Sequence, residues 1–241
     1  MNILLTGTSR GLGLAICKKL LERGDAVFAV SRTKSAEILE LERKFGGKLF
    51  FKSADLSNPE AAREEIFARD FISASVRLDG FVSNAASAYD DIATNMKLDK
   101  LEDMFKTNVF SPMLLTKYFL RQQLLHSNGG AIVYISSVSA HTGYKGLSMY
   151  AASKGAMEAF SKNIAREWGR KSVRSNVVAP GFMATEMSSG LSEEQRAKIY
   201  ARTSLKSETS IESVAETVVF LLSDKAKSIT GQTVCVDSGT I

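Results

Sequence analysis

The stretch Ile3-Leu4-Leu5-Thr6-Gly7-Thr8-Ser9-Arg10-Gly11-Leu12-Gly13 decides the fold of this chain. Its first four residues form a short apolar run, which is typical of a strand buried on both faces. Gly7, Gly11 and Gly13 permit a tight turn, and an apolar stripe with helical spacing begins at Leu12. A buried strand, a glycine turn and a helix predict the first βα unit of a parallel sheet.

The rest of the chain repeats this alternation. Further strands are predicted at 26–31, 49–52, 79–84, 131–136, 174–178 and 233–236, and helices at 12–23, 37–45, 58–73, 100–125, 150–168 and 213–222. The helix at 100–125 is expected to be irregular near Pro112. Strands alternating with helices predict an α/β fold: one Rossmann-type domain over residues 1–241, with a doubly wound parallel sheet of about seven strands and helices on both faces. Residues 186–210 are the least patterned, and we interpret them as a mobile helix-loop lid.

The composition excludes several classes of protein. The 241 residues suit one domain, and no apolar run approaches the ~20 residues that a membrane span needs. The first residues form a strand rather than a charged leader, so we expect no signal peptide. Cys17 and Cys235 are remote in sequence, which predicts neither a disulfide nor a metal site and favours a reducing cytoplasm. The net charge of +5 forms no basic stripe, which argues against nucleic-acid binding.

The glycine turn predicts a site for a dinucleotide. The start of the helix behind it presents unpaired N–H groups and the positive end of the helix dipole to a pyrophosphate. The spacing is G-x-x-x-G-x-G rather than the commoner G-x-G-x-x-G, so the strand-turn-helix context carries the interpretation. The alternative is an ordinary βα turn that happens to be rich in glycine.

The end of the second strand indicates which dinucleotide is bound. An NAD site usually has an acid here, which holds the 2′-hydroxyl of the ribose. This chain has Arg32, and Arg10 lies in the glycine turn. Two guanidinium groups suit a 2′-phosphate, so the sequence favours NADP(H), unless both arginines are merely solvated. Asp55, after the third strand, suits the adenine amino group or, alternatively, the start of the next helix.

Three residues in the second half form a candidate proton-transfer group. Tyr150 and Lys154 are four residues apart on one predicted helix and share a face. A nearby ammonium lowers the pKa of a tyrosine, which brings it toward the range useful for acid–base catalysis. Ser137 ends the fifth strand, where its hydroxyl can donate to a carbonyl oxygen that gains negative charge.

These motifs, in this order, resemble those of short-chain dehydrogenases/reductases over essentially the whole chain. The matching pieces are Thr6 to Gly13, Asp55, Asn84-Ala85-Ala86, Asn108, Ser137, Tyr150, Lys154 and Pro180-Gly181-Phe182-Met183-Ala184-Thr185. The family usually has glycine where Ala86 stands, so the extra methyl group is expected to crowd the cofactor slightly.

The resemblance implies a role for each catalytic residue. Tyr150 donates the proton in reduction, and Lys154 lowers its pKa and holds the nicotinamide ribose. Ser137, rather than the adjacent Ser136, orients the substrate carbonyl. Asn108 anchors a water that relays protons to Lys154.

The resemblance also implies the residues that bind NADP(H). They are Gly7, Ser9, Arg10, Gly11, Leu12, Gly13, Arg32, Asp55, Leu56, Asn84, Ala85, Ala86, Tyr150, Lys154, Pro180, Gly181, Met183 and Thr185.

Three segments, 161–167, 176–182 and 229–233, resemble the 3-oxoacyl-[acyl-carrier-protein] reductase branch of the family. That likeness implies NADPH-dependent reduction of a 3-oxoacyl thioester in fatty acid biosynthesis. A dehydrogenase of a sugar or other small alcohol and a catalytically silent nucleotide-binding regulator are the alternatives. Arg170 and Lys171 suggest a basic rim for an acidic acyl carrier protein, or simply complement a helix dipole. The family resemblance further implies a homotetramer or homodimer built on the two long helices.

Overall fold

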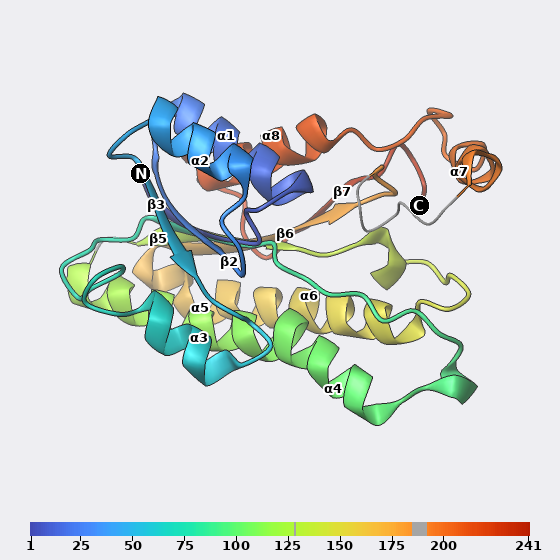
Figure 1. Cartoon of the computed structure of the whole chain (residues 1–241), viewed down its shortest axis with the longest axis horizontal. Helices are drawn as coiled ribbons and strands as arrows, with labels where there is room; N and C mark the ends of the chain where they lie inside the picture. Colours follow the sequence, from blue (N-terminus) through green and yellow to red (C-terminus); the bar gives the residue numbers. More distant parts are fainter. Residues whose placement is uncertain (128, 185–191) are drawn as a thin grey trace.

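One parallel sheet of seven strands runs through the molecule (Figure 1). The computed structural model describes residues 1–127, 129–184 and 192–241. The strands are β1 (Asn2–Thr6), β2 (Ala26–Ser31), β3 (Leu49–Ser53), β4 (Gly80–Ser83), β5 (Gly130–Ile135), β6 (Val173–Pro180) and β7 (Thr233–Val236), in the order β3-β2-β1-β4-β5-β6-β7. Every pairing is parallel, which confirms the predicted doubly wound sheet.

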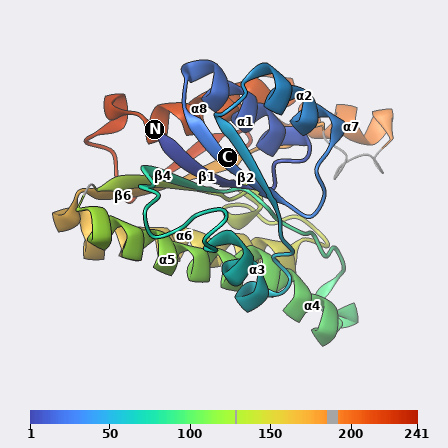
Figure 2. The same cartoon turned by 60° about the vertical axis from the view of Figure 1, so that its left-hand side comes forward.

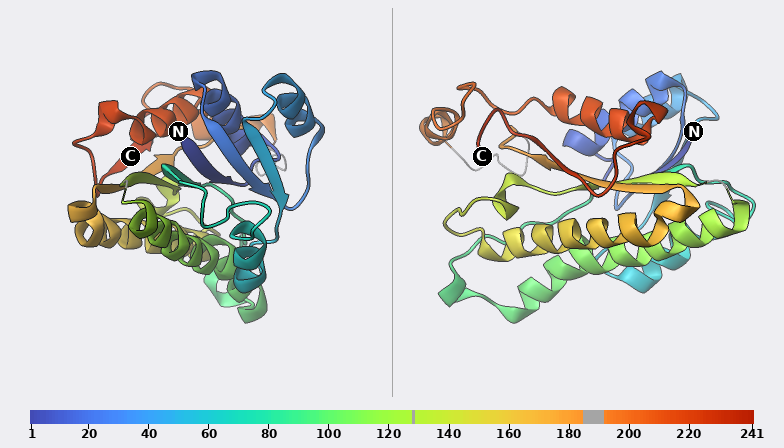
Figure 3. Two further views of the ribbon diagram at one scale, coloured as in Figure 1. Left: turned by 90° about the vertical axis from the view of Figure 1, so that its left-hand side faces the viewer. Right: turned by 180° about the vertical axis from the view of Figure 1, so that it is seen from behind.

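Helices cover both faces of the sheet (Figures 1 and 3). One layer holds α1 (Gly11–Arg23), α2 (Ala36–Lys44) and α8 (Ile211–Leu222). The other holds α3 (Pro59–Ile66), α4 (Leu98–Phe105), α5 (Ser111–His126) and α6 (Ser148–Trp168). A further helix, α7 (Glu193–Tyr200), lies beyond the end of the sheet, and Figure 2 shows it apart from both layers.

The two layers explain why the strands are apolar throughout. Ile3 and Leu5 of β1 belong to the core beneath α1 and α8, whereas Leu4 belongs to the core beneath α5 and α6. Successive side chains of a strand point to opposite faces, so both sets of residues must be apolar when both faces are covered. All three side chains are fully buried.

Gly24 ends the first βα unit. Its φ of 96° is left-handed, and its N–H bonds to carbonyls of the last turn of α1. Glycine adopts this conformation without the steric cost that a Cβ brings, so the sequence closes the helix here. The chain then turns directly into β2.

Two predicted helices differ from those observed. The helix predicted at 58–73 ends at Ile66, because the chain turns back there: the N–H of Ile72 donates to the Ile66 carbonyl (3.2 Å), and Phe71 and Ile72 are buried in the core beneath α5 and α6. The helix predicted at 100–125 is divided into α4, a π-helical turn η2 (Lys106–Phe110) and α5. The irregularity thus precedes Pro112, which occupies the first turn of α5, a position that proline tolerates.

Short 3-10 turns complete the chain: η1 (Ala93–Asn95), η3 (Val138–Ala140), η4 (Gly169–Lys171) and η6 (Asp224–Ala226). The predicted lid at 186–210 contains α7, which begins with a capping box of Ser192 and Gln195. Residues 186–191 of that segment lie outside the described residues. Across the described chain, no helix is long and apolar enough to span a membrane. Within the same residues, no group of three or more His, Cys, Asp or Glu side chains could hold a metal ion.

Candidate active site

The candidate site lies at the carboxyl ends of the strands, where the strand order reverses between β1 and β4. Doubly wound sheets bind ligands in the crevice at this point. The glycine turn follows β1, Asn84 follows β4, Ser137 follows β5 and Gly181 follows β6. The topology therefore gathers residues that are remote in sequence at one edge of the sheet.

The glycine turn is held in place by Asn84. Its Nδ2 donates to the carbonyl oxygens of Thr6 (3.1 Å) and Gly7 (3.0 Å). Gly7 has a φ of 74°, and a Cβ on it would lie 2.8 Å from the Cα of Ala85. A Cβ on Gly13 would lie 1.9 Å from the Gly7 carbonyl oxygen. The turn is thus packed against the loop after β4 so closely that side chains do not fit.

We expect Gly13→Ala to destabilise the protein by about 1–3 kcal/mol, because the neighbour it would strike is backbone and overpacking of this kind forces the backbone to move. Urea denaturation measures the change. Gly46→Ala is the matched control, since its Cβ would make only an ordinary contact at 3.8 Å from the carbonyl oxygen of Glu42. Equal stability of the two variants would contradict the packing argument.

The start of α1 has the properties of an anion site. Its N-cap residue, Arg10, makes no side-chain capping bond, and the first turn contains no acid. Hydrogen bonds from Gly7 N to Val30 O (2.7 Å) and between Thr8 Oγ1 and Ser31 Oγ (3.4 Å) join the turn to the end of β2. A pyrophosphate therefore fits the open N–H groups of this 13-residue helix.

Arg10 and Arg32 are both exposed at this end of the sheet. They lie on the two loops that the bonds described above join, which places both arginines near the same end of the predicted dinucleotide site. Ser9 and Leu12, also predicted to bind the cofactor, lie in the same βα segment, and Leu12 is buried beneath it.

The predicted adenosine side is formed by the loops after β3 and β4. The carboxylate of Asp55 accepts the N–H of Ser57 (3.0 Å) in the turn before α3, so it is partly engaged in local structure. Leu56 is buried, and Ser111 of α5 donates to its carbonyl. Ala85 and Ala86 are half-buried beside the glycine turn.

Tyr150 and Lys154 lie on α6, as the sequence predicts. Lys154 is 4% exposed; its Nζ donates to the Ile135 carbonyl (2.9 Å) and lies 5.5 Å from the centroid of the Tyr150 ring. Burial lowers the pKa of Lys154 to about 8, because water no longer solvates its charge. The lysine is therefore poised to change its charge close to neutral pH.

The pKa of Tyr150 departs from the sequence prediction. Burial raises it to about 12, and the negative charge of Asp90 acts in the same direction. The expected lowering of this pKa is thus not found in the chain as described here, because burial and the charge of Asp90 both disfavour the phenolate. Tyr150 stays protonated at neutral pH, which is the state that a proton donor needs.

Ser137 begins the turn η3. Its Oγ accepts the N–H of Ser139 (3.2 Å), which fixes the side chain at the start of the turn. Ser136, in contrast, is 3% exposed and donates to Glu158 of α6 (2.5 Å). The half-buried Ser137 is thus the more accessible of the two hydroxyls, in agreement with its selection over Ser136.

Asn108 lies inside the π-helical turn, a form frequently found at functional sites. Its Nδ2 donates to the carbonyl of Ser87 (2.8 Å) and to Ser153 Oγ (3.1 Å), and its Oδ1 accepts the N–H of Ser87 (2.9 Å). The side chain therefore ties the loop after β4 to α6, one residue from Lys154. Its role in a water relay stays a prediction.

The predicted nicotinamide end follows β6. Pro180 ends that strand, and the N–H of Gly181 donates to Val236 of β7 (2.9 Å). A Cβ on Gly181 would lie 2.4 Å from the hydroxyl of Thr209, which explains why glycine is needed. Met183 packs against the core beneath α1 and α8. Thr185 lies outside the described residues.

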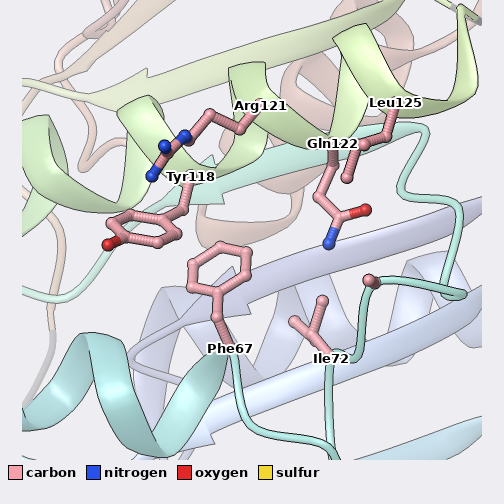
Figure 4. Close-up of a pocket in the computed structure, with 7 residues that line it drawn as sticks. Phe67, Ile72, Tyr118, Arg121, Gln122 and Leu125 are labelled. Atoms are coloured by element: carbon pink, nitrogen blue, oxygen red, sulfur yellow. The ribbon is translucent and has the colours of Figure 1, made fainter.

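One sequence-based expectation about the surface changes. Arg170 and Lys171 form η4, which leads into the amino end of β6. The candidate site is at the carboxyl ends, so these cations do not form a rim at the mouth of this chain's own crevice. A hollow of about 230 Å³ between the end of α3 and α5, where Phe67 faces Tyr118, also contains none of the predicted site residues (Figure 4).

Sequence reasoning missed two charged residues at the site, Asp90 and Glu158. Asp90, in the loop after β4, lies close enough to Tyr150 for its negative charge to raise the pKa of the tyrosine. Glu158 contacts both Ser136 and His141. The spacing of Glu158, four residues after Lys154 and eight after Tyr150, was a usable signal, since it places all three residues on one helix face. No comparable periodicity marks Asp90.

Fold and site together define a dinucleotide-binding protein with a tyrosine–lysine pair at its crevice. A family model described as enoyl-(acyl carrier protein) reductase matches residues 7–240. A 3-oxoacyl-[acyl-carrier-protein] reductase FabG of Salmonella typhimurium is 35% identical over 98% of this chain and 95% of its own length. The corresponding reductase of Staphylococcus epidermidis is 31% identical over 99% and 98%.

Solved structures show the same fold. A protein of Beutenbergia cavernae, described as an NAD(P)-dependent gluconate 5-dehydrogenase with NADP at low occupancy, superposes with a TM-score of 0.90. The two sequences are 29% identical. The match covers 99% of this chain and 96% of the chain of that protein. This chain belongs to the short-chain dehydrogenase/reductase family. It is thus an oxidoreductase that acts on CH–OH groups with a nicotinamide dinucleotide.

Proposed function

We propose that the protein is an NADPH-dependent reductase that converts a ketone, a 3-oxoacyl thioester, to the secondary alcohol. The observation that carries the proposal is that Tyr150 is protonated and lies beside the buried Lys154. It is supported by the similarity of nearly the whole chain to 3-oxoacyl-[acyl-carrier-protein] reductases. The bound NADPH supplies the hydride. The chain's own residues position the carbonyl and manage the proton.

The residues divide this work between them. Ser137, at the start of η3, donates a hydrogen bond to the carbonyl oxygen as negative charge develops on it. Tyr150 transfers its hydroxyl proton to that oxygen. The ammonium of Lys154 stabilises the phenolate that remains, because an opposite charge favours the ionised form. The buried setting strengthens each of these interactions relative to water.

An assay with purified protein tests the proposal. Acetoacetyl-CoA stands in for the carrier thioester, and the loss of reduced nicotinamide absorbance is followed with NADPH and NADH in parallel. Oxidation of NADPH that depends on the thioester supports the proposal. Binding of NADPH without turnover of the thioester contradicts it.

A second candidate is an NAD(P)-dependent dehydrogenase of a sugar or other small alcohol. The likeness to the structure described as a gluconate dehydrogenase favours it, as does the carboxyl group of Asp90 near Tyr150, which can accept hydrogen bonds from a polyol. Oxidation of a panel of sugar acids and polyols with NADP⁺ separates the two.

The catalytically silent regulator is disfavoured by the intact set of Asn108, Ser137, Tyr150 and Lys154.

The preference for NADPH rests on Arg32. We expect Arg32→Asp to raise the KM for NADPH by about 10–100-fold, because it removes a charge-assisted hydrogen bond to the 2′-phosphate and adds a repulsive charge. The KM for NADH should stay the same or fall, since an acid here suits a free 2′-hydroxyl. Arg43→Asp, an equal charge change on the exposed side of α2, is the control. Parallel changes for both cofactors would refute the assignment.

We further propose that copies of this chain associate through the layer of α4, α5 and α6, as the family resemblance implies. Leu98 (63%), Phe110 (52%) and Leu124 (52%) are large apolar side chains that α4, α5 and the turn between them leave exposed. They are spread along one helical layer, and a second copy packed on that layer would cover them. Sedimentation velocity distinguishes monomer, dimer and tetramer, and a monomer at micromolar concentration contradicts the proposal.

Arg170 and Lys171 lie away from the crevice of their own chain. An acyl carrier protein that docks on these two residues would therefore deliver its substrate to the crevice of a neighbouring chain.

A further inference from the structure

Glu158 is a buried acid that the proposed mechanism does not use. It lies on α6, one turn after Lys154 and two turns after Tyr150, and is 8% exposed. A carboxylate in such a place costs stability unless its charge is compensated by hydrogen bonds. Its partners therefore indicate why it is there.

The two partners of Glu158 enclose the turn that carries Ser137. Ser136, immediately before Ser137, donates its hydroxyl to Oε1 of Glu158 at 2.5 Å. His141, which ends η3, places its Nε2 3.0 Å from the same oxygen. A carboxylate oxygen only accepts, so Nε2 of His141 carries the hydrogen in this contact. One oxygen atom thus fixes both ends of a six-residue segment.

We propose that Glu158 is a positioning residue that sets the Ser137 hydroxyl relative to Tyr150 and Lys154. The turn and α6 come from different parts of the chain, and the contacts of Glu158 join them on the helix face that carries both catalytic residues. Productive geometry at such sites has a tolerance of about 0.5 Å, which a mobile turn does not meet. This inference rests on the reductase activity proposed above, because its main readout is turnover.

Other titratable groups near Glu158 lie on α6 itself and on β7. Lys154 is one turn away on α6, but its Nζ donates to the Ile135 carbonyl. On β7 the negative charge of Glu158 helps to raise the pKa of the Cys235 thiol, after burial and the charge of Asp237. The acid thus lies near Cys235 of β7 and contacts His141 at the end of η3, whereas the catalytic lysine bonds to a backbone carbonyl.

The test compares Glu158→Leu with the conservative Glu158→Gln. Leucine fills the space but accepts no hydrogen bond, so we expect kcat on acetoacetyl-CoA to fall about 10–100-fold while the Kd for NADPH changes less than about twofold. Glutamine keeps an acceptor oxygen and should restore at least half of the wild-type kcat. Glu167→Leu, an exposed glutamate on the same helix, is the control and should behave as wild type.

A second measurement separates this inference from the reductase proposal. Amide hydrogen exchange over residues 136–141 needs no substrate; we expect it to be at least tenfold faster in Glu158→Leu than in wild type or Glu167→Leu. The double variant Ser136→Ala/His141→Ala should reproduce both effects if Glu158→Leu does not fold. Unchanged exchange and unchanged kcat in either variant overturn the positioning role. Wild-type protein without turnover defeats the reductase proposal, whereas faster exchange in the variant still supports the role of Glu158 in the turn.

Discussion

Replacing Tyr150 with phenylalanine is expected to lower kcat for ketone reduction by at least about 100-fold. The change removes one oxygen atom and leaves the ring against Lys154, so the packing of α6 is preserved. Proton transfer by a positioned side chain contributes about 10²–10⁴-fold to a rate, and no other described residue at the crevice holds a hydroxyl in the same position. The measurement is the steady-state rate of NADPH oxidation with acetoacetyl-CoA.

The Tyr150→Phe prediction has a specific control. The Kd for NADPH should change by less than about threefold, because the residues proposed to hold most of the dinucleotide, the glycine turn and Arg32, lie on other loops than Tyr150. Tyr144→Phe, in the loop before α6, removes a tyrosine hydroxyl that the mechanism does not use and should retain most activity. Wild-type turnover in Tyr150→Phe would show that this tyrosine is not the proton donor, and Ser137 or Lys154 would then have to protonate the carbonyl oxygen.

The fold was predictable because its signals are local. A strand that is apolar at every position, such as β1, indicates burial on both faces, and Gly24 marks the end of α1 by its backbone requirement alone. The alternation of such units leaves few topologies. The end of α3 was not predictable in the same way. Phe71 and Ile72 continue a helical composition, and only the sheet that buries both side chains decides against the helix.

The site was predictable where chemistry and spacing coincide, as for Tyr150 and Lys154. Those parts of the site that depend on contacts between distant segments of the chain were not predictable. The π-helical turn around Asn108 follows from bonds to Ser87 and Ser153, which the local sequence does not encode. The pKa of Tyr150 was mispredicted for the same reason. The spacing of the lysine is visible in the sequence, whereas the burial of the phenol and the charge of Asp90 are products of the tertiary structure.

Lys154→Met is expected to change activity and stability in opposite directions. Activity should fall by about 100-fold or more, because no ammonium remains to stabilise the phenolate of Tyr150. Stability at pH 7 should rise, because burial has lowered the pKa of Lys154 from 10.5 to about 8 and methionine carries no charge to desolvate. The shift corresponds to about 3 kcal/mol, from which about 1 kcal/mol is lost with the hydrogen bond to Ile135. A net gain of about 2 kcal/mol is expected.

The pH dependence of the stability difference between Lys154→Met and wild type tests independently whether the buried charge of Lys154 is destabilising. Below pH 8 the lysine is charged in both the folded and the unfolded chain, so the cost of burying the charge is fully present. Between pH 8 and 10.5 the unfolded chain holds a proton that the folded chain has released, and wild-type stability gains from rising pH through this term. Lys154→Met lacks the term, so its advantage over wild type should shrink within that interval and reverse above it, where only the lost hydrogen bond to Ile135, about 1 kcal/mol, remains.

Urea denaturation of both proteins from pH 7 to 10.5 measures the difference, and other titrating groups cancel between them. Lys162→Met, an exposed lysine on the same helix, should show neither the gain in stability nor its loss with pH. A Lys154→Met variant less stable than wild type at pH 7 would mean that the contact with Ile135 outweighs the buried charge. A buried lysine that weakens the fold and yet is needed for turnover is what a site selected for chemistry rather than stability requires.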